Sequence, residues 1–490
     1  MADGRPEAAA HASAPGSASC EALRGILGAD ALLTGAACEP YLVDHRGLYH
    51  GRALGVALPR SVTQVSQLLA LCNAQRIGVV PHGGNTGYCG GATPDESGRQ
   101  LVLSLARLNR IRSVDPANDC LIAEAGCILA QVQQAAAAVQ RFFPLSLGSE
   151  GSCQIGGNLS TNAGGTSVLR YGMMRDLVLG LEVVLADGRV LGCLSGLRKD
   201  NTGYDIRGLF VGAEGTLGVI TAATLKLFPQ IASTATAFAA IADVRAAVTL
   251  LARLRAASGD RVSSFELIPR IGIELTTRHI PGVTDPLGAP HAWYALCELS
   301  SARAGEGLDA VLTEALGAAL NDGLVLDAVL AGSERERAAL WKLRETIPEA
   351  QRKEGAGLKH DISVPLSALP EFVARGSAWV SAHVPGARLV AYGHVGDGNL
   401  HFNLTEAEGA ARGALAARAG EVRRALHDLA VSLGGSFSAE HGIGRLKVCE
   451  LERYAPATEL ELMRAVKHAF DPHGIMNPGK VLRAEPPGPE

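Results

Sequence analysis

The sequence predicts an α+β protein with two substantial domains and a helical C-terminal segment, and three observations support this prediction. The chain has 490 residues, which exceeds the usual length of one domain. Between residues 58 and 229, short strand-like runs alternate with glycine clusters. From about residue 231 onward, longer Ala- and Leu-rich segments show helical periodicity. We therefore expect a lead-in over residues 1–45, a first domain over 46–230, a second domain over 231–440 and a C-terminal segment over 441–490.

The composition is that of a globular protein and excludes several other classes. Hydrophobic residues make up 47% of the chain and charged residues 19%, which argues against intrinsic disorder. The net charge of -4 provides no positive field for a phosphate backbone, so we expect no nucleic-acid partner. The 58 glycines exceed the usual share of roughly 7% but are not periodic, so they indicate loops rather than collagen.

The lack of a secretory signal and the spacing of the cysteines point to a reduced compartment. The first twenty residues lack the continuous apolar stretch of a secretory signal, and no run of about eighteen apolar residues predicts a transmembrane segment. The 10 cysteines include no CxxC pair, which argues against a disulfide scaffold. We expect a cytoplasmic protein, or one of the mitochondrial matrix if the source is eukaryotic.

Individual elements can be placed from turn chemistry and periodicity. The clearest strands are expected within Gly78–Pro81, Leu101–Leu105, Leu177–Gly188 and Leu217–Pro229. Ala-Asp-Gly at 186–188 is a hairpin signal. Helices are expected within Asp243–Asp260 and Leu308–Gly323, where apolar residues recur with a 3.6-residue period.

Three glycine clusters fall within the first expected domain. They read PHGGNTGYCGG at 81–91, GSEGSCQIGGNLSTNAGG at 148–165 and FVGAEGTLGVI at 210–220. Successive glycines let backbone N–H groups converge on an anion such as a pyrophosphate. Neither the GxGxxG nor the GxxxxGK[ST] motif occurs in the first cluster, so a Rossmann fold or a P-loop is unsupported. One such cluster alone would be an ordinary loop, whereas three favour a nucleotide-like ligand.

A histidine hairpin predicts a metal site. In YGHVGDGNLHFNL, the GDGN turn would pair Val395 with Leu400 and bring His394 directly opposite His401. SAEHGIG offers Glu440 as a third ligand, and two His with one Glu form a catalytic zinc set. Mn²⁺ and Co²⁺ also suit these donors. The alternative is a pair of hydrogen-bonded structural histidines beside a surface glutamate.

Two cations in LRETIPEAQRKEGAGLKHDISVP are candidates for binding a carboxylate. Arg344 presents a planar fork that matches a carboxylate, and Lys359 enters an expected strand where an inward lysine is costly. Taken alone, both side chains fit a solvated helix face better than a binding site.

Several long motifs together resemble one family. PHGGNTG, IGGNLSTNAGG, LRKDNTGYDIRGLFVGAEGTLGVIT, YGHVGDGNLHFNL, SAEHGIG and NPGK resemble the FAD-dependent D-2-hydroxyacid dehydrogenases, the D-2-hydroxyglutarate and D-lactate dehydrogenases above all. The resemblance covers roughly residues 44–482 and implies a vanillyl-alcohol-oxidase-type FAD-binding domain, a separate α+β substrate domain and a helical C-terminal segment. The linking histidine of related flavoproteins is replaced here by Asn85, so the resemblance implies non-covalent FAD.

The resemblance also implies a role for each candidate residue. His394, His401 and Glu440 match residues that bind a divalent metal, for which Zn²⁺ is the first choice, and His441 matches the catalytic base. Arg344 and Lys359 match residues that hold the substrate C1 carboxylate, with Asn403 on the same face as His401. The residues expected around FAD are Pro81, His82, Gly83, Gly84, Asn85, Thr86, Gly87, Gly148, Ser152, Gly156, Gly157, Asn158, Ser160, Asn162, Ala163, Gly164, Gly215, Gly218, Ile220 and Asn477.

The expected reaction is oxidation of a D-2-hydroxy acid to the 2-oxo acid, with hydride transfer to flavin N5 and D-2-hydroxyglutarate as the first choice of substrate. D-lactate and glycolate are the alternatives within the same fold. Pro348 stands where some relatives carry a threonine near the substrate, which leaves the choice of acid open. A flavin-free metallohydrolase is the alternative from a different class. The electron acceptor is expected to be an electron-transfer flavoprotein, a quinone or a cytochrome, and a homodimer is left open.

Overall fold

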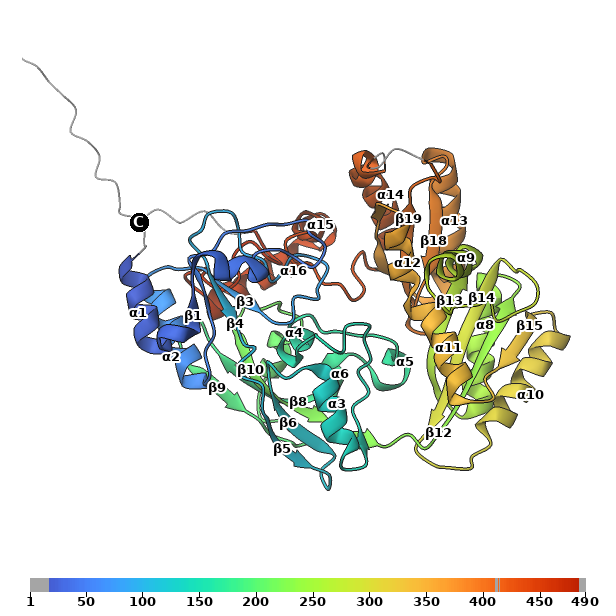
Figure 1. Ribbon diagram of the computed structural model, residues 1–490, viewed down its shortest axis with the longest axis horizontal. Helices are drawn as coiled ribbons and strands as arrows, with labels where there is room; N and C mark the ends of the chain where they lie inside the picture. The colour runs from blue at the N-terminus through green and yellow to red at the C-terminus, as the bar shows by residue number, and fades with distance from the viewer. Residues whose placement is uncertain (1–16, 410–412, 414, 484–490) are drawn as a thin grey trace, which may run out of the picture.

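The protein consists of two lobes, with the C-terminal segment returning to the first of them (Figure 1). The structure is a computed structural model and describes residues 17–409, 413 and 415–483. The expected N-terminal lead-in therefore lies partly outside the described residues. Within the described ranges, no helix combines the length and apolarity needed to cross a bilayer.

The first lobe contains two sheets that share a core. A four-stranded sheet has the order β1-β2-β4-β3, and a five-stranded antiparallel sheet has the order β5-β6-β10-β8-β9. The strands are β1 (Leu32–Leu33), β2 (Gly55–Ala57), β3 (Val79–His82), β4 (Leu101–Ser104), β5 (Ile111–Asp115), β6 (Cys120–Glu124), β8 (Val178–Val184), β9 (Val190–Cys193) and β10 (Val219–Lys226). The helices are α1 (Ser17–Leu27), α2 (Val62–Ala74), α3 (Leu129–Ala137), α4 (Ile155–Ser160), α5 (Val168–Tyr171), α6 (Met174–Leu177) and α7 (Ile206–Phe210). β7 (Arg141–Phe142) and β11 (Phe228–Pro229) form a short ribbon.

The glycine clusters lie where these sheets end. β3 pairs in parallel with β4, and the first cluster follows β3 directly. The second cluster contains α4, and the third leads into β10. Apolar side chains from both sheets, including Val79, Leu103, Val184 and Val219, are fully or almost fully buried in one core. This shared core holds the three clusters against one another.

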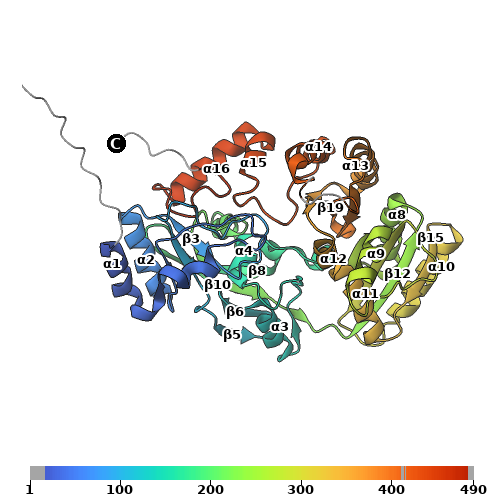
Figure 2. The ribbon, with the colours of Figure 1, turned by 45° about the horizontal axis from the view of Figure 1, so that its top comes forward.

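The second lobe is built on a four-stranded antiparallel sheet with helices on both faces (Figures 1 and 2). Its order is β13-β14-β12-β15, formed by β12 (Ser233–Ile241), β13 (Val262–Pro269), β14 (Trp293–Ser301) and β15 (Val325–Leu330). Alternate β12 residues point to opposite faces of the sheet. Ala237 packs on the face covered by α8 (Val244–Ser258) and α10 (Leu308–Asn321), and Phe238 packs on the opposite face. The helices on that face are α9 (Arg270–His279), α11 (Glu334–Glu345) and α12 (Ile347–Lys353).

A smaller sheet in the second lobe carries the histidine hairpin. β19 (Asn399–Thr405) pairs on one edge with β16 (Gly357–Leu358) and β17 (Asp361–Ser363), and on the other edge with β18 (Arg388–Tyr392). The helices packed nearby are α13 (Leu369–His383) and α14 (Ala419–Ser432). The segment after α14 crosses to the first lobe, on which α15 (Val448–Tyr454) and α16 (Ala457–Phe470) lie (Figure 2).

Most element predictions are confirmed. The expected strands correspond to β3, β4, β8 and β10, the helices to α8 and α10, and Ala-Asp-Gly forms the turn between β8 and β9. The predicted C-terminal helices are also present.

The predicted register of the histidine hairpin is wrong. Tyr392, not His394, lies opposite His401 in the ladder. Gly393 exchanges its backbone hydrogen bonds with Leu267 of β13, at 2.9 and 3.1 Å, instead of with β19. The observed register therefore differs from the predicted one by two residues, and His394 lies in the turn.

Candidate functional site

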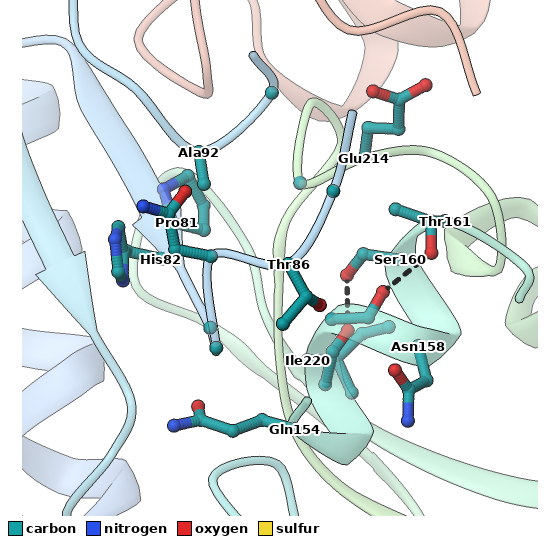
Figure 3. Close-up of a pocket in the computed structure, with 18 of the residues that line it drawn as sticks. Pro81, His82, Thr86, Ala92, Gln154, Asn158, Ser160, Thr161, Glu214 and Ile220 are labelled. Carbon is teal, nitrogen blue, oxygen red and sulfur yellow. Dashed lines mark hydrogen bonds between the residues drawn. The ribbon is translucent and has the colours of Figure 1, made fainter. Parts of the chain in front are cut away.

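An open cavity of about 1010 Å³ lies among the three glycine clusters of the first lobe (Figure 3). The loop after β3 forms one wall, and α4 forms another. Ser160 of α4 and the next residue, Thr161, are turned back on the helix, where their hydroxyls donate to the carbonyl oxygens of Gly156 and Gly157. The cavity wall therefore consists largely of backbone.

Most residues expected around a nucleotide cofactor line this cavity. They are Pro81, His82, Gly83, Gly84, Asn85, Thr86, Gly87, Gly156, Gly157, Asn158, Ser160, Gly215, Gly218 and Ile220. The expected residues that do not line it are Gly148, Ser152, Asn162, Ala163, Gly164 and Asn477. The lining residues that the sequence did not suggest include Cys89, Ala92, Leu105, Ala125, Gln154 and Glu214, most of which lie within or beside the same clusters.

The unexpected positions of two residues have simple causes. A Cβ atom on Gly84 would lie 2.3 Å from the carbonyl oxygen of Ser152. The Ser152 backbone therefore packs against this loop instead of lining the cavity. Asn477 donates to the carbonyl oxygens of Gly91 and Glu214 at 3.0 and 2.7 Å, which ties the C-terminal segment to the cavity wall.

The cavity fits a large polar ligand such as FAD. A Cβ atom at Gly87 or Gly157 would meet no other atom within 4 Å, so open space faces these backbones. Both ring nitrogens of His82, and Oε1 of Gln154, are buried without a hydrogen-bond partner among the described residues. Such groups usually have partners in native proteins, and polar atoms of a bound cofactor would provide them. Burial lowers the pKa of His82 to about 4, so its imidazole is neutral.

A cluster of histidines and carboxylates adjoins the cavity at His441, which also lines it. Nε2 of His394 and Nε2 of His401 face the same oxygen of Glu440, at 4.0 and 3.7 Å. A Zn²⁺ ion lies about 2.0 to 2.2 Å from its nitrogen and oxygen ligands, so the space between these donors suits one ion. The structure thus brings together the three residues expected to bind metal, although His394 reaches the cluster from the turn.

Glu266 of β13 holds His394 in the orientation that a metal ligand needs. Nδ1 of His394 donates to Glu266 at 2.7 Å, which leaves Nε2 directed at Glu440. The other oxygen of Glu266 accepts from Nε of Arg344, also at 2.7 Å. Burial alone would raise the pKa of Glu266, but Arg344 and His394 outweigh it and lower the pKa to about 2. One buried carboxylate therefore positions both a candidate metal ligand and a candidate carboxylate-binding residue.

Asp361 of β17 anchors the loop that carries Glu440 and His441. One of its oxygens accepts the backbone N–H groups of Glu440 and His441, both at 2.9 Å, and the other accepts Nδ2 of Asn399 at 2.8 Å. Nδ1 of His401 and Nδ1 of His441 lie 3.8 and 3.6 Å from this carboxylate. Burial would raise the pKa of Asp361, but electrostatic interactions with His441 and Lys447, and the backbone hydrogen bond from Glu440, outweigh this and lower it. Asp361 is close enough to join a metal set with His401, Glu440 and His441. Its engaged oxygens favour a supporting role instead.

Glu214 holds the same loop from the first lobe. Its carboxylate accepts the N–H groups of Ile443 and Gly444 at 2.7 and 2.8 Å. Burial raises the pKa of Glu214 despite these bonds. The loop is therefore held between Asp361 of the second lobe and Glu214 of the first. Burial also lowers the pKa of His441, which favours the neutral imidazole that a general base requires.

The candidate substrate residues surround the cluster. The guanidinium of Arg344 lies 4.9 Å from the ring centre of Tyr392, and Nζ of Lys359 lies 5.3 Å from that of Tyr88. The Tyr88 ring is 4.7 Å from that of His441. Asn403 is different, because its amide accepts from the His360 backbone and donates to Gln351, both at 3.1 Å, so it is engaged within the protein.

Sequence reasoning missed Glu266, Asp361 and Glu214 as contributors. A single glutamate in the apolar run SSFELIP and an aspartate in KHDISVP were the available signals, since a charge in a buried strand needs partners.

Two family models match the chain. The model described as FAD binding domain matches residues 53–194, and the model described as FAD linked oxidases, C-terminal domain, matches residues 231–481. The chain is 40% identical over 451 residues to a mitochondrial D-2-hydroxyglutarate dehydrogenase from Bos taurus, covering 91% of this chain and 79% of the relative. It is 37% identical over 449 residues to a D-2-hydroxyglutarate dehydrogenase from Xanthomonas citri pv. viticola, covering 91% and 93%.

Solved structures confirm the fold. The structure of p-cresol methylhydroxylase with bound substrate matches with a TM-score of 0.75 and 18% identity, over 95% of this chain and 96% of that chain. A 4-ethylphenol oxidase from Gulosibacter chungangensis matches with a TM-score of 0.72 and 17% identity, over 95% and 97%. These likenesses confirm the predicted α+β fold of the vanillyl-alcohol-oxidase type.

Proposed function

Because this chain belongs to the FAD-dependent D-2-hydroxyacid dehydrogenases, which are FAD-linked oxidoreductases, we propose that it oxidises D-2-hydroxyglutarate to the 2-oxo acid with the help of a divalent metal. Membership of this family leaves no support for a flavin-free metallohydrolase. The observation that carries the proposal is the convergence of His394, His401 and Glu440 beside His441, where His441 lines the glycine-walled cavity.

The cavity residues named above would hold FAD without a covalent link, and bound FAD would supply a hydride acceptor at N5. The backbone around Gly83, Gly84 and Gly157 suits its phosphates, while His82 and Gln154 have polar atoms free for it. His394, His401 and Glu440 would hold the metal, with Zn²⁺ the first choice, and a bound metal would supply a Lewis acid for the substrate oxygens.

The protein's own side chains would position the substrate and accept its proton. His441 is neutral, and its loop is held by the carboxylates of Asp361 and Glu214. His441 would take the proton of the α-hydroxyl group. Arg344, fixed by Glu266, and Lys359 would bind the C1 carboxylate and so orient the Cα–H bond. The electron acceptor would be an electron-transfer flavoprotein, a quinone or a cytochrome.

A panel of acids tests the proposal. Purified holoenzyme is mixed without oxygen with D- and L-2-hydroxyglutarate, D-lactate, D-malate and glycolate, and flavin absorbance is followed. We expect D-2-hydroxyglutarate to bleach the flavin with the highest second-order rate. Faster bleaching by D-lactate or glycolate would move the assignment to that acid, and bleaching by L-isomers alone would refute it.

A further inference from the structure

A group of cations lies beside the candidate base. Nζ of Lys359 contacts the face of Tyr88, and His45 meets the same ring edge-on at 5.6 Å. Arg46 follows His45 directly. Since the Tyr88 ring also lies 4.7 Å from His441, this group borders the place where the substrate would react.

Arg352 joins the group from α12. Its neighbour Gln351 accepts from Nδ2 of Asn403, and Oδ1 of Asn403 in turn accepts the N–H of His360, the residue after Lys359. These two hydrogen bonds hold the backbone beside Arg352 next to the backbone beside Lys359. Burial, together with the positive charges of Arg46 and Arg352, lowers the pKa of Lys359 to about 8, which agrees with this placement.

The three cations lack a counter-charge within the protein. Across residues 17–409, 413 and 415–483, the side chains of Arg46, Arg352 and Lys359 form neither an ion pair nor a hydrogen bond. Lys353, the next residue along α12, is different, because it pairs with Glu349 at 2.9 Å and donates to the carbonyl oxygen of His279 at 3.0 Å. Gathering like charges without a partner is unfavourable, and an anion bound between them would relieve the repulsion.

We propose that Arg46 and Arg352 bind the second, distal carboxylate of a dicarboxylic 2-hydroxy acid and thereby select it over monocarboxylic acids. The proposal rests on the proposed function, in which Arg344 and Lys359 hold the first carboxylate. Arg344 is engaged by Glu266 and the Tyr392 ring, whereas the charges of Arg46 and Arg352 act on Lys359. A five-carbon diacid has its two carboxylates at opposite ends, and guanidinium groups match a carboxylate well.

By this proposal, both lobes would contribute to recognition of the diacid. Arg46 belongs to the first lobe and Arg352 to the second, so a diacid between them would bridge the lobes. The three-carbon acid lactate has no group that could reach either arginine once its single carboxylate is bound.

The test compares a diacid with a monoacid in the same variants. Holoenzyme with Arg46→Ala, Arg352→Ala or both is assayed by anaerobic flavin reduction with D-2-hydroxyglutarate and with D-lactate, and Lys353→Ala serves as the matched control. Each arginine variant should raise the half-saturating concentration of D-2-hydroxyglutarate about 10- to 100-fold and change that of D-lactate by less than about twofold. The control should behave as wild type with both acids.

Binding of glutarate provides a measurement that does not depend on turnover. Glutarate has both carboxylates but no hydroxyl group, and calorimetry on the oxidised holoenzyme should show the same loss of affinity in the arginine variants. Arg352→Glu changes an exposed side chain and should weaken glutarate binding further. If Arg46→Ala loses its FAD, the glutarate affinity of Arg352→Glu tests the distal carboxylate site by itself.

Two failures can be told apart. If wild-type flavin is bleached by D-2-hydroxyglutarate but the arginine variants bind both acids as wild type does, or lose both equally, the distal carboxylate site is refuted while the proposed function stands. If no D-2-hydroxy acid bleaches the wild-type flavin, the proposed function fails and the distal site fails with it.

Discussion

Glu266 offers a direct test of how the site is organised. Glu266→Gln keeps the shape of the side chain but removes the charge, and its single amide oxygen can accept from only one of Arg344 and His394. Both donors now lie 2.7 Å from a carboxylate that is only 1% exposed. The pKa of Glu266, about 2 against an ordinary 4.5, corresponds to about 3 kcal/mol in favour of the ionised group. We expect the free energy of unfolding to fall by about 3 kcal/mol and metal affinity to fall about 10- to 100-fold.

Denaturant unfolding measures the first effect, and competition with a coloured zinc chelator measures the second. Glu298→Gln is the matched control, because Glu298 is a buried carboxylate of the same sheet that binds Arg337 and Trp341 at 2.7 and 2.8 Å but contacts no histidine. It should lose stability without losing metal affinity. The reasoning is refuted if Glu266→Gln binds zinc as tightly as wild type, or if both variants lose zinc equally.

Three further predictions concern other parts of the site. Asp361→Asn should lower kcat about 10- to 100-fold while FAD content stays constant, because the carboxylate anchors the loop of His441. A kcat within twofold of wild type would contradict this. Gly157→Leu should give a folded protein, since its Cβ would meet no protein atom within 4 Å. The leucine side chain would enter the cavity, so the protein should purify with little FAD. Stoichiometric FAD would be inconsistent with the assigned cavity. Affinity for the hydroxy acid should fall as pH rises through about 8, because the lowered pKa of Lys359 means that its ammonium group is deprotonated there. Lys359→Arg should abolish this pH dependence, since arginine stays charged. An unchanged pH profile in this variant would argue against a role for Lys359.

The sequence predicted those features that depend on local signals. Glycine clusters after strands, apolar periodicity and turn chemistry identified β3, β4, β8, β10, α8 and α10, and the same clusters supplied most of the cavity lining. The metal candidates could also be named, because paired histidines around a glycine turn are a local pattern.

Features that depend on distant partners could not be predicted. The hairpin register was wrong because Gly393 pairs with Leu267, a residue far away in sequence, and no local signal reveals that exchange. Glu266 lies 128 residues before His394, and Asp361 lies 80 residues before His441, so their roles appear only once the chain is folded. Gly148 was expected at the cofactor from its place in the second glycine cluster, and Ala163 from the family resemblance. Only the fold separates residues that line the cavity from residues that support it.

The central claim is that the glycine-walled cavity and the histidine–carboxylate cluster act together on one substrate. The most direct measurement is anaerobic flavin reduction by D-2-hydroxyglutarate before and after removal of metal with a chelator, with FAD content checked in each sample. We predict that the metal-free protein keeps its FAD but is bleached at least about 100-fold more slowly, and that added Zn²⁺ restores the rate. A metal-free protein that retains FAD and is bleached at the original rate would contradict the account.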